Sequence, residues 1–525
     1  MSDKAPIGRI LVALYLLVPF LYGSCVSGLV LREPDICFLL TMGREISQNG
    51  IPATDPFLFA AAPQADMPGL SYVVYQWLFE LVLYQIYNIF SAPGILVFAA
   101  ILQSWAFGLA PYRFFDRLGI RGALPLLFCA AILFGSFSHI CIRPEIVSQF
   151  FCAIEIELLL AYMLSRSSAK TTTDWRLIGI LTIVSNIWAN SHCLFPLAPA
   201  LCLMALIACT IAWRKLDNTL LTALASIIIA TMATPYGIKL WTFLPSLFFN
   251  PINTTINELA PLNWGHVASP VYTPFFALVI LCAYNAAKGF LTLYREHKIA
   301  GLARISPEWW FALTMAIPAV ILTLKSNRCV SLALIMLAAS LAVFMRGTSR
   351  QRERQGEKAE GQENFWLTIF GARKTFTNII WMTLTALGAL MMTRVIPPAI
   401  PQGSAAFEPP LKAVAYLDEH LHTGADSEHI FNTPHFGNVL IWQSKKRPQI
   451  YFDSRYFLFD MPFRLRFWRI INCKQNWQAE FYKPQLDFKY VFIEPKDPLA
   501  TALSKDSNWR RVYADDLAVI FYKVQ

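Results

Sequence analysis

The chain has 525 residues, of which 56% are hydrophobic and 15% are charged, with a net charge of +10 and a mean hydropathy of +0.45. Because soluble domains carry roughly 25% charged residues, this composition excludes an ordinary soluble protein. The basic residues lie in short clusters beside apolar runs, without interleaved aromatic residues, which argues against a nucleic-acid-binding protein.

Apolar runs long enough to span a bilayer recur along the chain. The first, residues 10–31, is long for a signal peptide and is expected to be a retained helix. Ten further spans are expected at 93–112, 122–140, 146–164, 176–192, 195–213, 218–235, 271–291, 308–324, 328–346 and 375–396. The sequence therefore predicts an α-helical membrane bundle of about eleven transmembrane helices.

A twelfth apolar stretch, residues 71–90, is ambiguous. Counting it as a crossing would place the basic cluster that follows 93–112 on the external side, against the positive-inside rule. Its glutamines, tyrosines and acidic residue favour a helix that lies at the membrane interface. The N-terminus is then inside, 32–92 forms a long first external loop, and the polar segment 347–374 is a cytoplasmic linker.

Residues 397–525 follow the last span and are expected outside the membrane. Alternating short strands and helices predict a small α/β domain. The expected strands are 429–432, 448–453, 488–495, 509–514 and 517–524, and the expected helices are 409–422, 462–473 and 497–504. Because no glycine-rich phosphate loop or nucleophile elbow is found, a binding or lid module is favoured over a second enzyme.

Two aspartates in the first external loop are candidates for chemistry: Asp35, just after the first span, and Asp55, before Pro56. A carboxylate at the mouth of a membrane cavity can take a proton from an acceptor hydroxyl. Carboxylate oxygens also suit a divalent cation. The structural alternative is that Asp35 caps the following helix and Asp55 caps a turn.

Three cations stand at predicted external ends of spans, where positive charge is disfavoured: Arg143, Lys325 and Arg328. Arg143 is expected to have an anionic partner, which is Glu145, a loop carboxylate or a phosphate. Cations in such positions can bind a phosphate group. Structural ion pairs are the alternative.

Several short motifs along most of the chain carry a family resemblance. They are Asp35, Gly43-Arg44, Gly50-Ile51-Pro52, Asp55-Pro56-Phe57, Gln76 to Glu80, Arg143-Pro144, Trp188 to His192, Pro235-Tyr236-Gly237, Asn257-Glu258, Asn432, Gly437 and Tyr451 to Arg455. This pattern resembles a bacterial family of multispanning proteins that is similar to the GT-C glycosyltransferases, such as oligosaccharyltransferases, protein mannosyltransferases and the aminoarabinose transferase of lipid A. Gln76 departs from it, because histidine is expected there.

The resemblance implies an inverting transfer of a sugar from a polyprenyl-phosphate donor. The acceptor would be a glycan, lipid or protein at the external face of the bacterial cytoplasmic membrane. Asp35 is the implied base, Asp55 the second catalytic candidate, and both are candidate ligands of Mg²⁺ or Mn²⁺. The implied contacts to the donor phosphate are Arg143, Lys325 and Arg328, and those to acceptor or sugar are Glu80, Asn190, His192, Glu258, Asp453 and Arg455.

Each of these roles has a structural or functional alternative. His192 fits a satisfied structural histidine, and Asp453 with Arg455 fits a local ion pair. A ligase or polymerase of lipid-linked glycans is expected to concentrate such residues in a late external loop, whereas here the early loop is long. A transporter should show inverted repeats, and no clear repeat is found. A non-catalytic scaffold would tolerate loss of Asp35.

Overall fold

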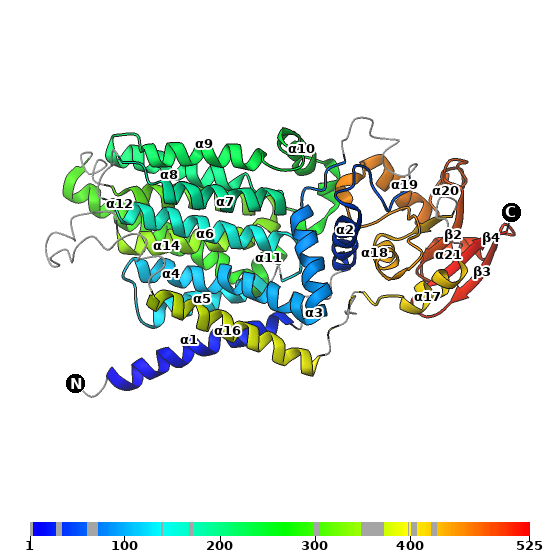
Figure 1. Cartoon of the computed structure of the whole chain (residues 1–525), viewed down its shortest axis with the longest axis horizontal. Coiled ribbons are helices and arrows are strands. Elements are labelled where there is room, and N and C mark those ends of the chain that lie inside the picture. Colours follow the sequence, from blue (N-terminus) through cyan, green and yellow to red (C-terminus); the bar gives the residue numbers. More distant parts are fainter. Residues whose placement is uncertain are drawn as a thin grey trace.

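The computed structural model describes residues 4–27, 34–59, 72–137, 140–166, 172–298, 305–347, 372–396, 398, 400, 407–421 and 428–524. The predicted linker at 347–374 lies almost wholly outside these residues. The helices of the bundle run side by side, and the C-terminal domain stands at one end of them (Figure 1). Those helices are α1 (Lys4–Ser27), α5 (Ala123–Ser136), α6 (Glu145–Leu164), α7 (Trp175–Ser191), α8 (Leu197–Trp213), α9 (Asn218–Met232), α12 (Thr273–His297), α13 (Pro307–Lys325), α14 (Val330–Arg346) and α16 (Ala372–Val395).

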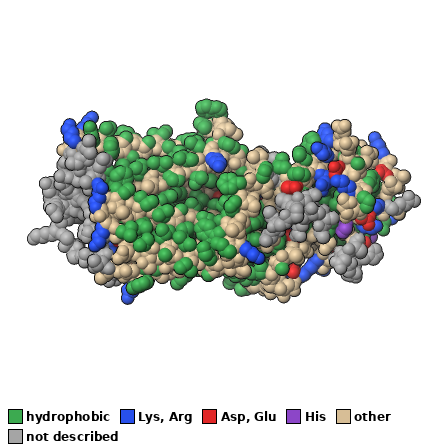
Figure 2. Space-filling model, turned by 90° about the horizontal axis from the view of Figure 1, so that it is seen from above, with side chains coloured by type: hydrophobic (Ala, Val, Ile, Leu, Met, Phe, Trp, Pro, Cys, Tyr) green, Lys and Arg blue, Asp and Glu red, His purple; other side chains and the backbone are tan. Residues whose placement is uncertain are grey.

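The apolar character of the helices supports a membrane bundle. Within the described residues, six helical stretches are long and apolar enough to cross a membrane: Trp77–Arg117, Glu145–Leu164, Pro270–Glu296, Pro307–Lys325, Asn327–Arg346 and Thr375–Val395. Figure 2 shows apolar side chains over the middle of the bundle, with lysines and arginines gathered at the end away from the C-terminal domain. Every predicted span contains a helix, but eleven crossings remain a prediction.

Residues 77–90 of the ambiguous stretch form a helix of their own. α3 (Trp77–Ser104) breaks at Ser91, whose φ of 54° and ψ of −158° are not helical. Its first half lies across the bundle end beside α2 (Asp35–Asn49), and its second half runs along the bundle (Figure 1). A π-helical turn, η2 (Trp105–Leu109), and α4 (Ala110–Arg117) continue it. A straight helix of 41 residues would be about 60 Å long, twice a bilayer core of about 30 Å, so the break is needed.

α1 and α16 cross on one flank of the bundle (Figure 1). Two glycines allow the backbones to touch there. A Cβ on Gly23 would overlap the carbonyl of Thr385, and one on Gly388 would overlap the carbonyl of Phe20. Small residues at helix crossings are typical of membrane bundles, where close packing replaces the hydrophobic effect as the force between helices.

The C-terminal domain holds a four-stranded sheet in the order β1-β2-β4-β3. β1 and β2 are parallel, and the other pairs are antiparallel. The strands are β1 (His429–Asn432), β2 (Phe488–Ile493), β3 (Trp509–Ala514) and β4 (Val519–Lys523). The helices of the domain are α17 (Leu411–His420), α18 (Pro434–Gln443), α19 (Met461–Ile471), α20 (Trp477–Phe481) and α21 (Pro498–Leu503). This arrangement confirms the small sheet domain expected after the last span.

The strand predicted at 448–453 is wrong. In that segment only Ile450 forms β-bridges, one to Leu58 of the first loop and one to Ile430 of β1. The side chain of Asn432 takes the place of a strand partner, because it accepts from Tyr451 N at 2.9 Å and donates to Phe452 O at 2.6 Å. The segment therefore joins the first loop to the sheet domain.

Candidate active site

Asp35 opens α2 at the bundle end that faces the C-terminal domain (Figure 1). A negative charge in the first turn of a helix is favoured by the helix dipole. The Asp35 carboxylate lies 3.2 Å from Arg143 Nη2 and 3.5 Å from Asn438 Nδ2, and its side chain is 23% exposed. Asp35 thus meets residues from two other elements and keeps access to solvent.

Arg143 stands between two carboxylates. It precedes α6, and it pairs with Asp35 and, through Nη1, with Glu258 of the short helix η5 (Asn257–Leu259). The side chains of Arg143 and Glu258 are 17% and 45% exposed. The expected anionic partner of Arg143 is therefore a pair of loop carboxylates. Glu145, the other expected partner, pairs with Arg328.

Arg328 and Lys325 occupy the turn between α13 and α14. Arg328 Nε donates to Glu145 Oε2 at 2.6 Å, and Glu145 is nearly buried at the start of α6. Arg328 is also close enough to Arg143 and Glu258 for their charges to act on it. Lys325 is exposed and lies 5.8 Å from the ring centroid of Phe249. The structure thus brings Arg328 to the Asp35 cluster as one side of an ion pair and leaves Lys325 at the surface.

A hydrogen bond between backbones holds this turn in place. Asn327 N donates to Ala260 O at 2.9 Å, two residues beyond Glu258. The segment that carries Glu258 and the turn that carries Arg328 are therefore fastened together. Their charges act on one another because of this contact, although 70 residues separate them in the sequence.

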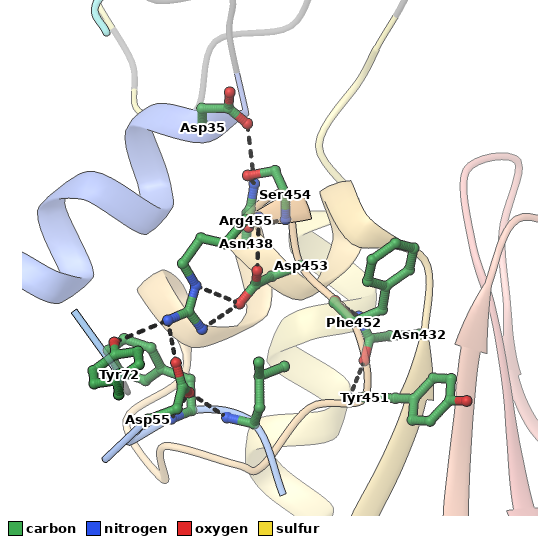
Figure 3. Close-up of polar contacts among 12 residues, drawn as sticks. Asp35, Asp55, Tyr72, Asn432, Asn438, Tyr451, Phe452, Asp453, Ser454 and Arg455 are labelled. Carbon is green, nitrogen blue, oxygen red and sulfur yellow. Dashed lines mark hydrogen bonds and ion pairs between the residues drawn. The ribbon is translucent and has the colours of Figure 1, made fainter. Parts of the chain in front are cut away.

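Asn438 and Ser454 of the C-terminal domain reach the cluster from the other side. Asn438 Nδ2 donates to Ser454 Oγ at 2.8 Å and points toward Asp35 (Figure 3). Tyr456 follows nearby, and burial together with the charge of Asp35 raises the pKa of its hydroxyl. Sequence reasoning did not select these residues. Their only signal was position, because Asn438 follows Gly437 and Ser454 lies inside the motif Tyr451 to Arg455.

Gly437 is required for this arrangement. A Cβ at this position would overlap Asn432 Nδ2 and the carbonyl oxygen of Phe452. The glycine lets α18 approach the end of β1, and α18 then carries Asn438 toward Asp35. The glycine noted in the motif therefore has a packing reason.

Asp55 belongs to a different cluster, on the far side of Arg455 from Asp35 (Figure 3). Arg455 pairs with Asp55 through Nη1 and with Asp453 through Nε at 3.0 Å and Nη2 at 2.5 Å. Its guanidinium also donates to Tyr72 Oη at 3.1 Å and lies 4.6 Å from the ring centroid of Phe38. The three charged side chains are at most 3% exposed. Burial raises the pKa of Asp453.

These contacts change the expectation for Asp55. Its Oδ1 accepts from the backbone N–H groups of Phe57 at 2.9 Å and Leu58 at 2.8 Å, while Oδ2 meets Arg455. Both oxygens are therefore engaged, and the structure favours the turn cap over a catalytic or metal-binding role. Among the described residues no group of three or more His, Cys, Asp or Glu is placed to hold a metal ion. Asp35 and Asp55 lie in separate clusters, so the structure does not bring these two predicted ligands together on one divalent cation.

Three of the predicted acceptor-binding residues are internal. Asn190 Oδ1 accepts from Trp77 Nε1 at 2.9 Å, and His192 Nδ1 lies 2.6 Å from Ser148 Oγ. Glu80 is fully buried and accepts from Gln76 Nε2 at 2.7 Å. These contacts favour structural roles for all three. Asp453 and Arg455 form the local ion pair that was the structural alternative from the sequence. Glu258 is the remaining predicted acceptor-binding residue, and it lies beside Asp35 in the cluster around Arg143.

Comparison with protein-family models and with curated proteins gives no match to the sequence. Solved structures do match. The archaeal oligosaccharyltransferase AglB from Archaeoglobus fulgidus, in complex with an inhibitory peptide and a dolichol-phosphate, is 12% identical with a TM-score of 0.52. Its apo form is 14% identical, also with a TM-score of 0.52. Both matches cover 91% of this chain and 69% of AglB.

ArnT from Cupriavidus metallidurans bound to undecaprenyl phosphate is 13% identical, with 98% of both chains covered and a TM-score of 0.49. At the identity of the AglB matches, the likeness establishes the fold. The apolar helices make the chain an integral membrane protein. The chain shares its fold with AglB.

Proposed function

We propose that the chain is a glycosyltransferase that moves a sugar from a polyprenyl-phosphate donor to an acceptor, with Asp35 as general base. One observation carries the proposal. A partly exposed carboxylate faces Arg143 and Asn438 at the bundle end covered by the C-terminal domain. The fold is shared with AglB, whose complex holds a dolichol-phosphate.

The proposed reaction uses the charges of this cluster. Asp35 takes the proton of the acceptor group, the acceptor attacks the anomeric carbon from the side opposite the phosphate, and the bond from that carbon to the phosphate oxygen breaks. The anomeric carbon is inverted, and the lipid phosphate leaves with a full negative charge. Arg143 and Arg328 supply the positive charge that stabilises it.

Arg143 is already paired in the structure, so a donor phosphate has to compete for it. Glu258 is the more exposed of its two partners, at 45% against 23% for Asp35. An exposed pair costs little to break. We therefore expect the phosphate to replace Glu258 on Arg143, which would free Glu258 to meet the acceptor.

The positive-inside pattern supports a placement in the membrane. We propose that the N-terminus lies in the cytoplasm and that Asp35 and the C-terminal domain lie outside, at the bacterial cytoplasmic membrane. The arginines and lysines at the opposite bundle end (Figure 2) fit this orientation. The acceptor is then a glycan, lipid or protein on the external side.

The substitution Asp35→Asn tests the proposed base. Membranes from a strain that lacks the gene are supplied with either variant, and transfer of labelled sugar from extracted polyprenyl-phosphate sugars to endogenous acceptors is measured. Loss of a general base should lower the rate about 10²- to 10⁴-fold. The matched control is Asp487→Asn, which removes a surface pair with Lys523 in the sheet domain and should leave transfer unchanged.

Three outcomes would contradict the proposal. If Asp35→Asn reaches normal membrane levels and transfers normally, Asp35 is not the base. If the wild-type protein binds polyprenyl phosphate but deletion of its gene changes no glycolipid or glycoprotein, the chain is a scaffold with a transferase fold. A product in which whole lipid-linked glycans are joined would favour the ligase alternative.

A further inference from the structure

A second arginine cluster lies at the bundle end away from the C-terminal domain. Arg113 and Arg117 of α4 both reach Glu157 of α6, with Nη2 to Oε1 distances of 2.5 Å and 2.6 Å. All three side chains are at most 11% exposed. As sequence, these arginines only mark the cytoplasmic end of a span. In the structure they turn inward.

The cluster has donor capacity to spare. Two cations share one carboxylate oxygen, so the three side chains carry a net positive charge. Arg117 is 3% exposed, and its Nε and Nη1 have no hydrogen-bond partner among the described residues. Unpaired donors of a buried cation are costly, and they attract an anion that can accept from them.

A cavity adjoins these arginines between α1, α4 and α16. Its polar lining is formed by Tyr15, Tyr112, Arg113, Arg117, Thr377 and Asn378, with Asp116 also on its wall. Hydroxyl, amide and guanidinium groups therefore face one space, a set that suits phosphate oxygens. Asp116 is balanced by the exposed Arg121, whose Nε lies 3.4 Å from its carboxylate.

The surface around the cavity is apolar. α1 and α16 lie on the outer flank of the bundle (Figure 1), and they expose Leu14, Leu17, Phe376 and Ile379 to between 38% and 63%. A polar cavity bordered by exposed apolar helices matches the two parts of a lipid. The phosphate would enter the cavity and the acyl or prenyl chain would follow the helices.

We propose that this cavity binds the phosphate of an anionic lipid headgroup, in the leaflet opposite the candidate active site. The shared chemistry is a phosphate ester on a long apolar chain, as in phosphatidylglycerol and in polyprenyl phosphates. Arg117 is the principal contact, because its unpaired N–H groups gain acceptors. The proposal stands independently of the transferase, since it uses no residue of the Asp35 cluster.

Native mass spectrometry of the purified full chain provides the test. The probes are phosphatidylglycerol, undecaprenyl phosphate, phosphatidylcholine and inorganic phosphate, each titrated separately. Arg117→Gln should weaken binding of the two anionic lipids about fivefold, the effect of one basic residue at a membrane surface. Arg113 still pairs with Glu157 in this variant, so the fold should persist. Tyr112→Phe is a milder second variant, expected to weaken binding about twofold.

The matched control is Arg214→Gln, an exposed arginine that does not line the cavity. The proposal is supported if anionic lipids lose affinity in the cavity variants and not in the control. The ratio of the two anionic lipids then identifies the source of the phosphate. Equal binding of phosphatidylcholine, an equal loss in the control, or no loss in either cavity variant would overturn it. Binding of inorganic phosphate as tight as that of the lipids would overturn the lipid assignment.

Discussion

Two clusters connect the first loop to other parts of the molecule, and each consists of one arginine between two carboxylates. Asp35 and Glu258 flank Arg143, and Asp55 and Asp453 flank Arg455. In the first cluster the side chains are 17% to 45% exposed, and in the second they are at most 3% exposed. A buried pair holds its geometry and excludes reactants, whereas an open pair can exchange partners. Burial therefore separates the structural cluster from the cluster that we propose to be reactive.

The largest expected effect comes from breaking the buried cluster. Arg455→Met leaves the buried carboxylates of Asp55 and Asp453 without their cation, which should cost about 3–5 kcal/mol of stability. The measurement is the midpoint of thermal unfolding of the detergent-solubilised protein. Arg447→Met is the control, because Arg447 is 49% exposed and its pair with Glu45 should matter little. Equal shifts in both variants would remove the distinction.

Arg143→Gln should have the opposite profile. Because Arg143 lies in the open cluster, its loss should leave the unfolding midpoint almost unchanged. Transfer should fall about 10²-fold, since a cation that stabilises the leaving phosphate is removed. Transfer and unfolding are measured on the same preparations. A large drop in stability with normal specific activity would make Arg143 structural.

Asn438→Ala should have an intermediate effect. It removes the amide that lies between Ser454 and Asp35, which should lower transfer about tenfold through misplacement of the carboxylate. A positioning role predicts that the rate at saturating donor falls while the donor concentration for half-maximal rate stays constant. Asn438→Asp, which keeps the shape but reverses the hydrogen-bonding capacity, should not restore the rate. Full activity of Asn438→Ala would exclude this role.

The smallest effect is expected for Glu258→Gln. Glu258 is the most exposed member of either cluster, so the unfolding midpoint should not change. If a donor phosphate replaces Glu258 on Arg143, the substitution should strengthen binding of polyprenyl phosphate, by about two- to fivefold. Binding is measured by titration of the purified protein. Weaker binding would show that Glu258 does not compete with the phosphate.

The sequence predicted the elements of this molecule better than their contacts. Four of the five strands expected in the C-terminal domain are present, because their runs of aromatic and branched residues act locally. The fifth, 448–453, fails because the side chain of Asn432 ends its pairing. The sequence of residues 448–453 gives no sign that a side chain takes the place of the neighbouring strand.

The same contrast applies to the site. Asp35 and Arg143 stood out because a charge beside a span is conspicuous, and they do lie together. Asp55 was equally conspicuous, but the sequence did not indicate that Arg455 would be its ion-pair partner. Asn438 was not predicted, because a neutral amide residue gives no unusual charge or spacing in the sequence. The pairing of distant residues depends on tertiary packing, which local patterns do not record.

The ion pair between Asp55 and Arg455 also affects the order in which the chain folds during synthesis. The two residues are 400 positions apart. At a synthesis rate of about 5–20 residues per second, Asp55 waits roughly 20–80 s for its partner. During that interval the spans can enter the membrane and fold against one another, while the loop lacks the residues that hold it. A nascent chain therefore carries Asp35 long before Asn438 and Ser454 enclose it, and the end of the molecule that holds the candidate active site is assembled last.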